Sequence, residues 1–124
     1  MGNSPPDPER WFLDQTEVYR QILDAIADMV LVKGAQSRIL WANKAFRDYY
    51  GMSNQELLNI VDAAFSPVDF TAQYVRDDAQ VFDTGAVLDI PDEPVARHDG
   101  LVQTFHTVKS PLRDAEGKVR MTVG

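Results

Sequence analysis

The segment RILWANKAF, residues 38–46, constrains the fold more than any other part of the chain. A short apolar run ends at Asn43, and a helical pattern begins directly after it. Asparagine is a preferred helix N-cap, because its side-chain oxygen accepts a hydrogen bond from a free backbone N–H of the first turn. Gly51 then suits the left-handed backbone at which helices often end. The segment therefore predicts a strand that passes directly into a short helix.

Two elements are predicted before this segment. After a proline-rich lead-in, residues 9–27 place apolar side chains at helical spacing, which predicts an amphipathic helix with an unusually broad apolar face. Residues 29–32 form a short apolar strand, and 33–37 supply the turn. Both early strands are apolar at successive positions, which favours a sheet covered on both faces.

Helices and then strands are predicted after Gly51. Ser53 and Glu56 form a capping box for one short helix. Residues 68–84 form a longer helix, in which Asp77 and Asp78 are assigned to a solvated face. The remainder predicts about three strands, from segments 86–90, 95–97, 101–110 and 118–123.

This order of elements predicts an α+β fold. Short connections favour a five-stranded antiparallel sheet, with the helices inserted between its second and third strands and the amphipathic helix at the N-terminus. We divide the chain into a lead-in and N-terminal helix, residues 1–18, and a single folded domain, residues 19–124. A length of 124 residues supports one core.

Charge and cysteine content restrict the function classes. The net charge of −7 argues against nucleic-acid partners, because phosphate binding needs clustered Lys and Arg. No cysteine is present, which rules out thiolate metal sites and cysteine nucleophiles and fits a reducing compartment. The longest apolar run is far below the ~20 residues that span a bilayer. We therefore expect a cytoplasmic protein that does not insert into membranes by this segment.

Several short motifs follow one another along the chain. Asn43 is followed by Phe46 and Gly51. The other motifs are Glu56-Leu57-Leu58, Glu93-Pro94 with Asp99-Gly100, and Lys109-Ser110-Pro111-Leu112-Arg113-Asp114. In this order and spacing they resemble the motifs of PAS domains, the signal-input modules of bacterial sensor proteins. The resemblance covers nearly everything after Tyr19. It implies a PAS-like sheet and a sensory role.

The resemblance also implies where a ligand would lie. In PAS-like folds the aromatic core holds the ligand, so the candidate pocket residues are Phe46, Tyr49, Tyr74, Phe82 and His106. The family's flavin-adduct and thioester chromophores need a cysteine and are excluded. The resemblance does not lead us to expect haem, because residues 69–84, the helix that supplies the iron ligand in the family's haem sensors, contain no histidine. A noncovalent flavin or a small organic ligand stays open. Two isolated histidines do not have metal-site spacing, so we expect no metal.

Two functions compete. The first is a signal-input and dimerisation module that regulates a linked output domain, as in two-component histidine kinases or diguanylate cyclases, with no catalysis of its own. Its homodimer would form through the N-terminal helix, including Trp11 and Phe12, and the outer face of the sheet. The second is a small cone-shaped α+β enzyme of the isomerase or dehydratase kind. His106 or Asp62 would then be the base in an apolar pocket.

Overall fold

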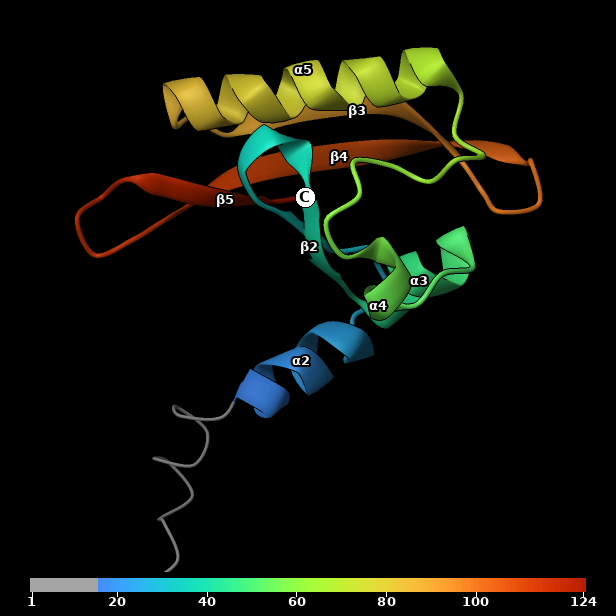
Figure 1. The fold of residues 1–124 in the computed structure, drawn as a ribbon, viewed down its shortest axis with the longest axis horizontal. Coiled ribbons are helices and arrows are strands. Elements are labelled where there is room, and N and C mark those ends of the chain that lie inside the picture. The colour runs from blue at the N-terminus through green and yellow to red at the C-terminus, as the bar shows by residue number, and fades with distance from the viewer. Residues whose placement is uncertain (1–15) are drawn as a thin grey trace, which may run out of the picture.

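The fold is an antiparallel sheet with helices packed against it (Figure 1). The structure, a computed structural model, describes residues 16–124. Its five strands lie in the order β2-β1-β5-β4-β3, and every neighbouring pair is antiparallel. The strands are β1 (Leu31–Lys33), β2 (Ile39–Ala42), β3 (Leu88–Ala96), β4 (Val102–Arg113) and β5 (Val119–Val123).

The helices are inserted between β2 and β3, as predicted. They are α3 (Lys44–Tyr50), α4 (Asn54–Leu57) and α5 (Val68–Thr84), and a further helix, α2 (Thr16–Ala25), precedes β1. A short 3₁₀ turn, η1 (Ala35–Ser37), joins β1 to β2. In Figure 1, α5 runs along the β3 and β4 side of the sheet, whereas α3 and α4 lie together at the end of β2. The predicted α+β class is confirmed.

Local chemistry sets the ends of these helices. Asn43 caps α3 by accepting a hydrogen bond from the backbone N–H of Phe46 at 3.2 Å. At the other end Gly51 adopts a left-handed φ of 63°, which glycine reaches without the steric cost of a Cβ. Ser53 and Glu56 form the reciprocal capping box predicted for α4. The strand-to-helix segment therefore folds as its sequence indicates.

Two strands are longer than predicted. Segments 86–90 and 95–97 are not separate strands, because β3 continues across a register shift between Ile90 and Glu93. Pro94 is tolerated within β3, since this strand is at the edge of the sheet. β4 likewise continues through Pro111 to Arg113. Its pairing with β3 ends at Lys109, so at Pro111 one side of β4 is an edge of the sheet, where proline is tolerated.

The N-terminal predictions are partly outside the described residues. The helix predicted over 9–27 overlaps α2, and the boundary proposed after residue 18 lies within α2. Trp11 and Phe12, which were assigned to a homodimer interface, fall outside residues 16–124. Within α2, Tyr19 and Ile22 are more than 40% exposed. The structure of one chain does not test the dimer, which stays a prediction.

Candidate functional site

A cavity of about 660 Å³ lies between the sheet and helices α3 and α5. This volume is within the range of pockets that bind small molecules. Its apolar lining includes Leu31, Ile39, Phe46, Val95 and Phe105, and its charged lining includes Lys33, Asp62, Asp78, Glu93 and Lys109. The cavity therefore combines apolar surface with several buried charges.

The predicted pocket residues divide into three groups. Phe46 and Tyr74 are buried and line the cavity. Tyr49 and Phe82 do not line it; the Tyr49 hydroxyl donates to the Val95 carbonyl at 2.7 Å. His106 is among the lining residues, but its side chain is 63% exposed and its Nε2 lies 2.7 Å from Asp89. The structure thus brings two of the five predicted residues together inside the cavity.

A buried ion cluster joins three elements at the cavity. Asp78 of α5 is 2% exposed, and its two carboxylate oxygens accept hydrogen bonds from the ammonium groups of Lys33 at 2.9 Å and Lys109 at 2.7 Å. The Ser37 hydroxyl also donates to Asp78. Lys33 lies on β1 and Lys109 on β4, so a single carboxylate ties the long helix to two strands that are not neighbours in the sheet.

Burial and pairing within the cluster shift the pKa values of Asp78 and Lys33. Burial opposes ionisation of Asp78, but the charges of Lys33 and Lys109 outweigh it and hold the pKa of this carboxyl below its usual range. Burial also lowers the pKa of Lys33, because the loss of hydration exceeds the attraction of Asp78. The attraction between Asp78 and the two lysines offsets the cost of removing these groups from water.

The prediction that Asp78 lies on a solvated helix face was wrong. Its neighbour Asp77 is half-buried, but Asp78 shares the buried face of α5 with Tyr74 and Val81. The spacing of these three residues, i, i+4 and i+7, is visible in the sequence and would have placed Asp78 on the apolar face. The two lysines were missed as well, since they lie 45 and 31 residues from Asp78.

Glu93 is a second buried carboxylate of the cavity. It is 8% exposed, and its Oε1 accepts a hydrogen bond from the Thr107 hydroxyl at 2.9 Å. Its Oε2 has no hydrogen-bond partner among the described residues. Burial and then the charge of Glu93 raise the pKa of the nearby Tyr74 hydroxyl, which stays protonated and donates to the Pro94 carbonyl.

Asp62 belongs to a fully bonded polar group at another part of the lining. Its Oδ1 accepts from Tyr50 at 2.6 Å, and its Oδ2 accepts from Thr71 at 2.6 Å. The Ser66 hydroxyl and the Ala63 backbone N–H also donate to Oδ1. Burial, followed by the negative charge of Asp62, raises the pKa of Tyr50. With four donors on its oxygens, Asp62 is poorly arranged to accept a proton from a substrate.

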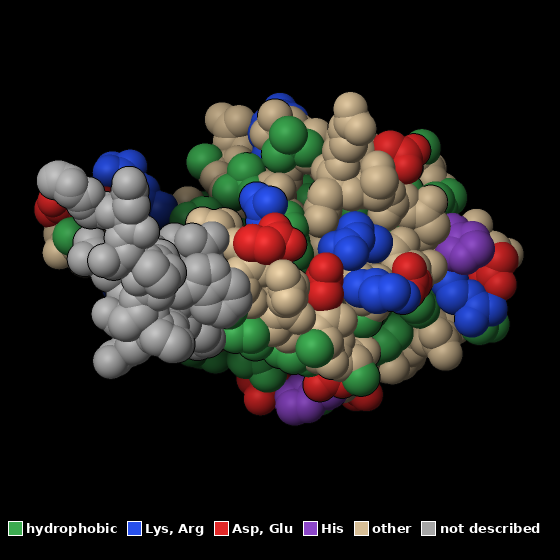
Figure 2. Space-filling model, turned by 90° about the horizontal axis from the view of Figure 1, so that it is seen from below, with side chains coloured by type: hydrophobic (Ala, Val, Ile, Leu, Met, Phe, Trp, Pro, Cys, Tyr) green, Lys and Arg blue, Asp and Glu red, His purple; other side chains and the backbone are tan. Residues whose placement is uncertain are grey.

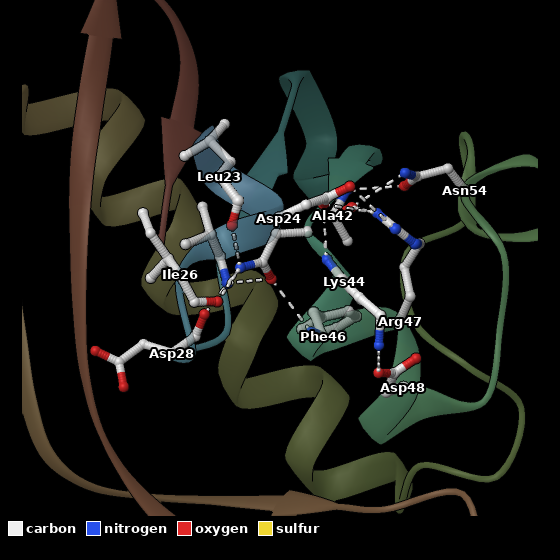
Figure 3. Close-up of polar contacts among 12 residues, drawn as sticks. Leu23, Asp24, Ile26, Asp28, Ala42, Lys44, Phe46, Arg47, Asp48 and Asn54 are labelled. Carbon is white, nitrogen blue, oxygen red and sulfur yellow. Dashed lines mark hydrogen bonds and ion pairs between the residues drawn. The ribbon is translucent and has the colours of Figure 1, made fainter. Parts of the chain in front are cut away.

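Asn43 does more than cap α3. It is fully buried, its Oδ1 also accepts from the Val30 backbone N–H at 2.9 Å, and its Nδ2 donates to the carbonyls of Leu23 and Asp28 at 2.9 Å each. Figure 3 shows these carbonyls converging on the β2–α3 junction. The side chain therefore fastens the end of α2 to the start of α3.

Charged side chains reinforce the same junction. Asp24 of α2 accepts from the Lys44 backbone N–H at 2.9 Å and pairs with Arg47 at 3.2 Å (Figure 3). Arg47 also donates to the Ala42 carbonyl at 2.7 Å. The Asn54 side chain exchanges two hydrogen bonds with the Ala42 backbone. The position of α2 is thus coupled to the strand and helix that border the cavity.

No group of three or more His, Cys, Asp or Glu side chains within residues 16–124 is arranged to hold a metal ion. Across the same residues, no helix has the length and apolar character that crossing a bilayer requires.

Residues 23–124 match the sequence profile of a family described as the PAS fold. The chain belongs to the PAS family. The resemblance drawn from Asn43, Gly51 and the motifs that follow them is confirmed. PAS domains are in general sensory rather than catalytic modules.

Two curated relatives contain a similar PAS segment within much longer chains. A diguanylate cyclase of Vibrio cholerae serotype O1 is 26% identical over 98 residues, which cover 79% of this chain and 30% of the cyclase. FilI, a methanogenesis regulatory histidine kinase of Methanothrix harundinacea, is 29% identical over 107 residues, which cover 82% of this chain and 11% of the kinase. The PAS chain therefore spans less than a third of either relative.

Solved structures share the fold at low sequence identity. VqmA of Vibrio cholerae, in a complex with ligand and DNA, superposes with a TM-score of 0.76 at 22% identity, over 90% of this chain and 50% of VqmA. The PAS domain of a protein from Colwellia psychrerythraea gives a TM-score of 0.69 at 13% identity, over 86% of this chain and 90% of that domain. At these identities the likeness establishes the fold alone.

The VqmA structure contradicts the predicted partners. We expected kinase or cyclase output and no nucleic acid, yet a chain that contains this fold was solved with DNA. The net charge of −7 describes one domain, and in Figure 2 basic side chains lie beside acidic ones on the face that is shown. Since PAS domains occupy part of longer chains, this charge says nothing about what the rest of such a protein binds.

Proposed function

We propose that this PAS domain is a cytoplasmic signal-input module that binds a small organic molecule in its cavity and reports occupancy to a covalently linked output region. The observation that supports this most is the cavity of about 660 Å³, in which aromatic and aliphatic side chains surround buried charged groups. Apolar surface provides affinity, and a few fixed polar groups provide selectivity. The output class is not part of the proposal, because the relatives include a cyclase, a kinase and a DNA-bound regulator.

The end of β5 and the residue that follows it could transmit ligand binding to the rest of the sheet. Thr122 and Gly124 line the cavity, and Gly124 exchanges two backbone hydrogen bonds with Leu31 of β1, each 2.9 Å long. A molecule in the cavity would therefore contact the end of the sheet's central strands. A bound molecule can shift the domain between two arrangements only through such differential contacts.

We propose no catalysis for this domain. The two bases named for the enzyme alternative are poorly placed, because His106 is exposed and paired with Asp89 while Asp62 is saturated with donors. Turnover of a small substrate that is lost in both His106→Ala and Asp62→Asn would contradict this part of the proposal.

A cavity-filling substitution tests the proposed function. The 124-residue chain is purified, and its native mass spectrum and absorbance spectrum are compared with those of Val95→Phe, which puts a ring against the cavity, and of Val87→Phe, a control at a position that is 61% exposed. We expect a retained organic molecule in the wild-type chain and the control and its loss in Val95→Phe. Equal retention by folded Val95→Phe would refute binding in this cavity.

A further inference from the structure

The buried carboxylate of Glu93 is the starting point. Glu93 is only 8% exposed and lines the cavity. Its Oε2, however, has no hydrogen-bond partner in the described part of the chain. Leaving a buried charged oxygen unpaired is costly, and native structures rarely do so without a reason. The terminal torsion of a glutamate side chain is soft, so Oε2 can turn toward a donor in the cavity while Oε1 keeps Thr107.

Lys109 offers the complementary group. Its ammonium has three N–H donors, and Asp78 is its single hydrogen-bond acceptor within residues 16–124. The ammonium also lies 5.9 Å from the centre of the Tyr74 ring, which lines the same cavity. At least one N–H of Lys109 is thus available to a carbonyl-type acceptor near an aromatic wall.

Strand β4 brings the two groups to one face of the sheet. Thr107, which donates to Glu93, and Lys109 are two residues apart on this strand and so lie on the same face, and both line the cavity. Their backbone positions are about 7 Å apart along an extended strand. This spacing of the two anchor positions is on the scale of a small ring-sized molecule.

The charges of the four buried charged residues in the lining already balance. The two lysines, Lys33 and Lys109, face two carboxylates, Asp78 and Glu93, so this buried set has no net charge for an ionic ligand to neutralise. Asp62, which also lines the cavity, is only half-buried and is held by four hydrogen-bond donors of its own. Bringing a further ion into a buried site would cost that ion its hydration. An uncharged molecule avoids this cost.

We propose that the cavity selects a small, flat, uncharged organic molecule with an O–H or N–H donor for Glu93 at one end and a carbonyl-type acceptor for Lys109 at the other. This assignment rests on the proposed ligand-binding function and adds the chemical class of the ligand. Tyr74 and Phe46 would contact the ring between the two polar ends.

Four probes, each with one benzene ring, test the assignment by NMR titration of the 124-residue chain. 4-Hydroxyacetophenone has both polar ends, 4-methoxyacetophenone has its donor blocked, 4-cyanoacetophenone has an acceptor in place of the donor, and 4-(aminomethyl)benzoate is a zwitterion. We expect the hydroxy compound to bind the wild-type chain about tenfold more tightly than the methoxy and cyano compounds, the usual effect of one hydrogen bond to a charged group. Equal binding of these three, no binding of any probe, or tighter binding of the zwitterion would overturn the proposal.

Glu93→Gln should reverse the selectivity. The amide nitrogen is a donor where the carboxylate oxygen was an acceptor, so the variant should favour the cyano over the hydroxy compound, whereas a merely structural role of Glu93 would leave their ratio unchanged. Glu116→Gln, at an exposed turn, is the matched control and should keep the wild-type order. If Glu93→Gln does not fold, Glu93→Ala decides. It removes the acceptor, so the hydroxy compound should lose its advantage over the methoxy compound, and an unchanged advantage would overturn the proposal.

These outcomes separate the two proposals. A retained molecule that is lost in Val95→Phe, together with no preference for the hydroxy probe, overturns the ligand class and leaves ligand binding standing. Retention that Val95→Phe does not alter refutes the proposed function itself.

Discussion

Replacing Asn43 with alanine should destabilise the domain by about 2–4 kcal/mol. Loss of an N-cap alone costs about 1 kcal/mol. The structure adds the Val30 backbone N–H, which is only partly exposed and would lose its acceptor, at about 1–3 kcal/mol for an unsatisfied buried group. The Asp28 carbonyl is at an exposed residue and can bind water instead, so we add nothing for it.

The variant Asn43→Asp separates the role of Asn43 as the N-cap of α3 from its role as a donor to the carbonyls at the end of α2. Aspartate is as good an N-cap as asparagine, so the cap itself survives this change. It has no N–H donor, however, and its carboxylate would face the Leu23 and Asp28 carbonyls that Nδ2 contacts now. We therefore expect a loss of stability close to that of the alanine variant.

Urea unfolding followed by circular dichroism measures both variants, and hydrogen exchange reports on α2. Exchange should quicken in α2 more than in α5, because Asn43 donates to carbonyls at the end of α2 and none of its hydrogen bonds in the described part of the chain reaches α5. An aspartate variant as stable as the wild-type chain would refute the reasoning, since capping would then be the whole role of Asn43.

Three further predictions concern the ion cluster, the end of α5 and the surface histidine. Asp78→Asn should lose about 3–5 kcal/mol, the usual result of leaving buried charges unpaired, as measured by urea unfolding; a loss below 1 kcal/mol would contradict the burial of the cluster. Because the folded pKa of Asp78 is below its unfolded value of about 3.9, its contribution is present above that value and is lost as pH falls through the folded pKa, so the acid limb of the stability profile should flatten in the variant. Gly85→Ala should cost more than Gly117→Ala in thermal melts: both have positive φ, but a Cβ at Gly85 would meet the Arg113 guanidinium that donates to its carbonyl, and equal costs would count against that contact. His106→Ala should change stability by less than about 1 kcal/mol, because an exposed ion pair contributes little, and a larger loss in the same melts would show that the exposed position is wrong.

The sequence alone determined the local turns and ends. Asn43, Gly51, the Ser53–Glu56 capping box and Gly85 act on backbone groups within a few residues of themselves, so their chemistry is visible without tertiary structure. Their order also sufficed to identify the family and the α+β class. The same local rules wrongly predicted two strands in place of β3. Prolines near its register shift look like the end of a strand when the pairing with the neighbouring strand is not known.

The character of the cavity was decided by tertiary structure. Phe46 and Tyr74 could be chosen as aromatic candidates, but nothing local distinguishes them from Tyr49 and Phe82, which do not line the cavity. Lys33, Asp78 and Lys109 look like ordinary surface charges in their own segments and become a buried cluster only when β1, α5 and β4 meet. A charged side chain is buried at low cost only where an opposite charge lies beside it in the folded chain. The partners of Asp78 are 31 and 45 residues away in the sequence, so the sequence around Asp78 does not reveal them.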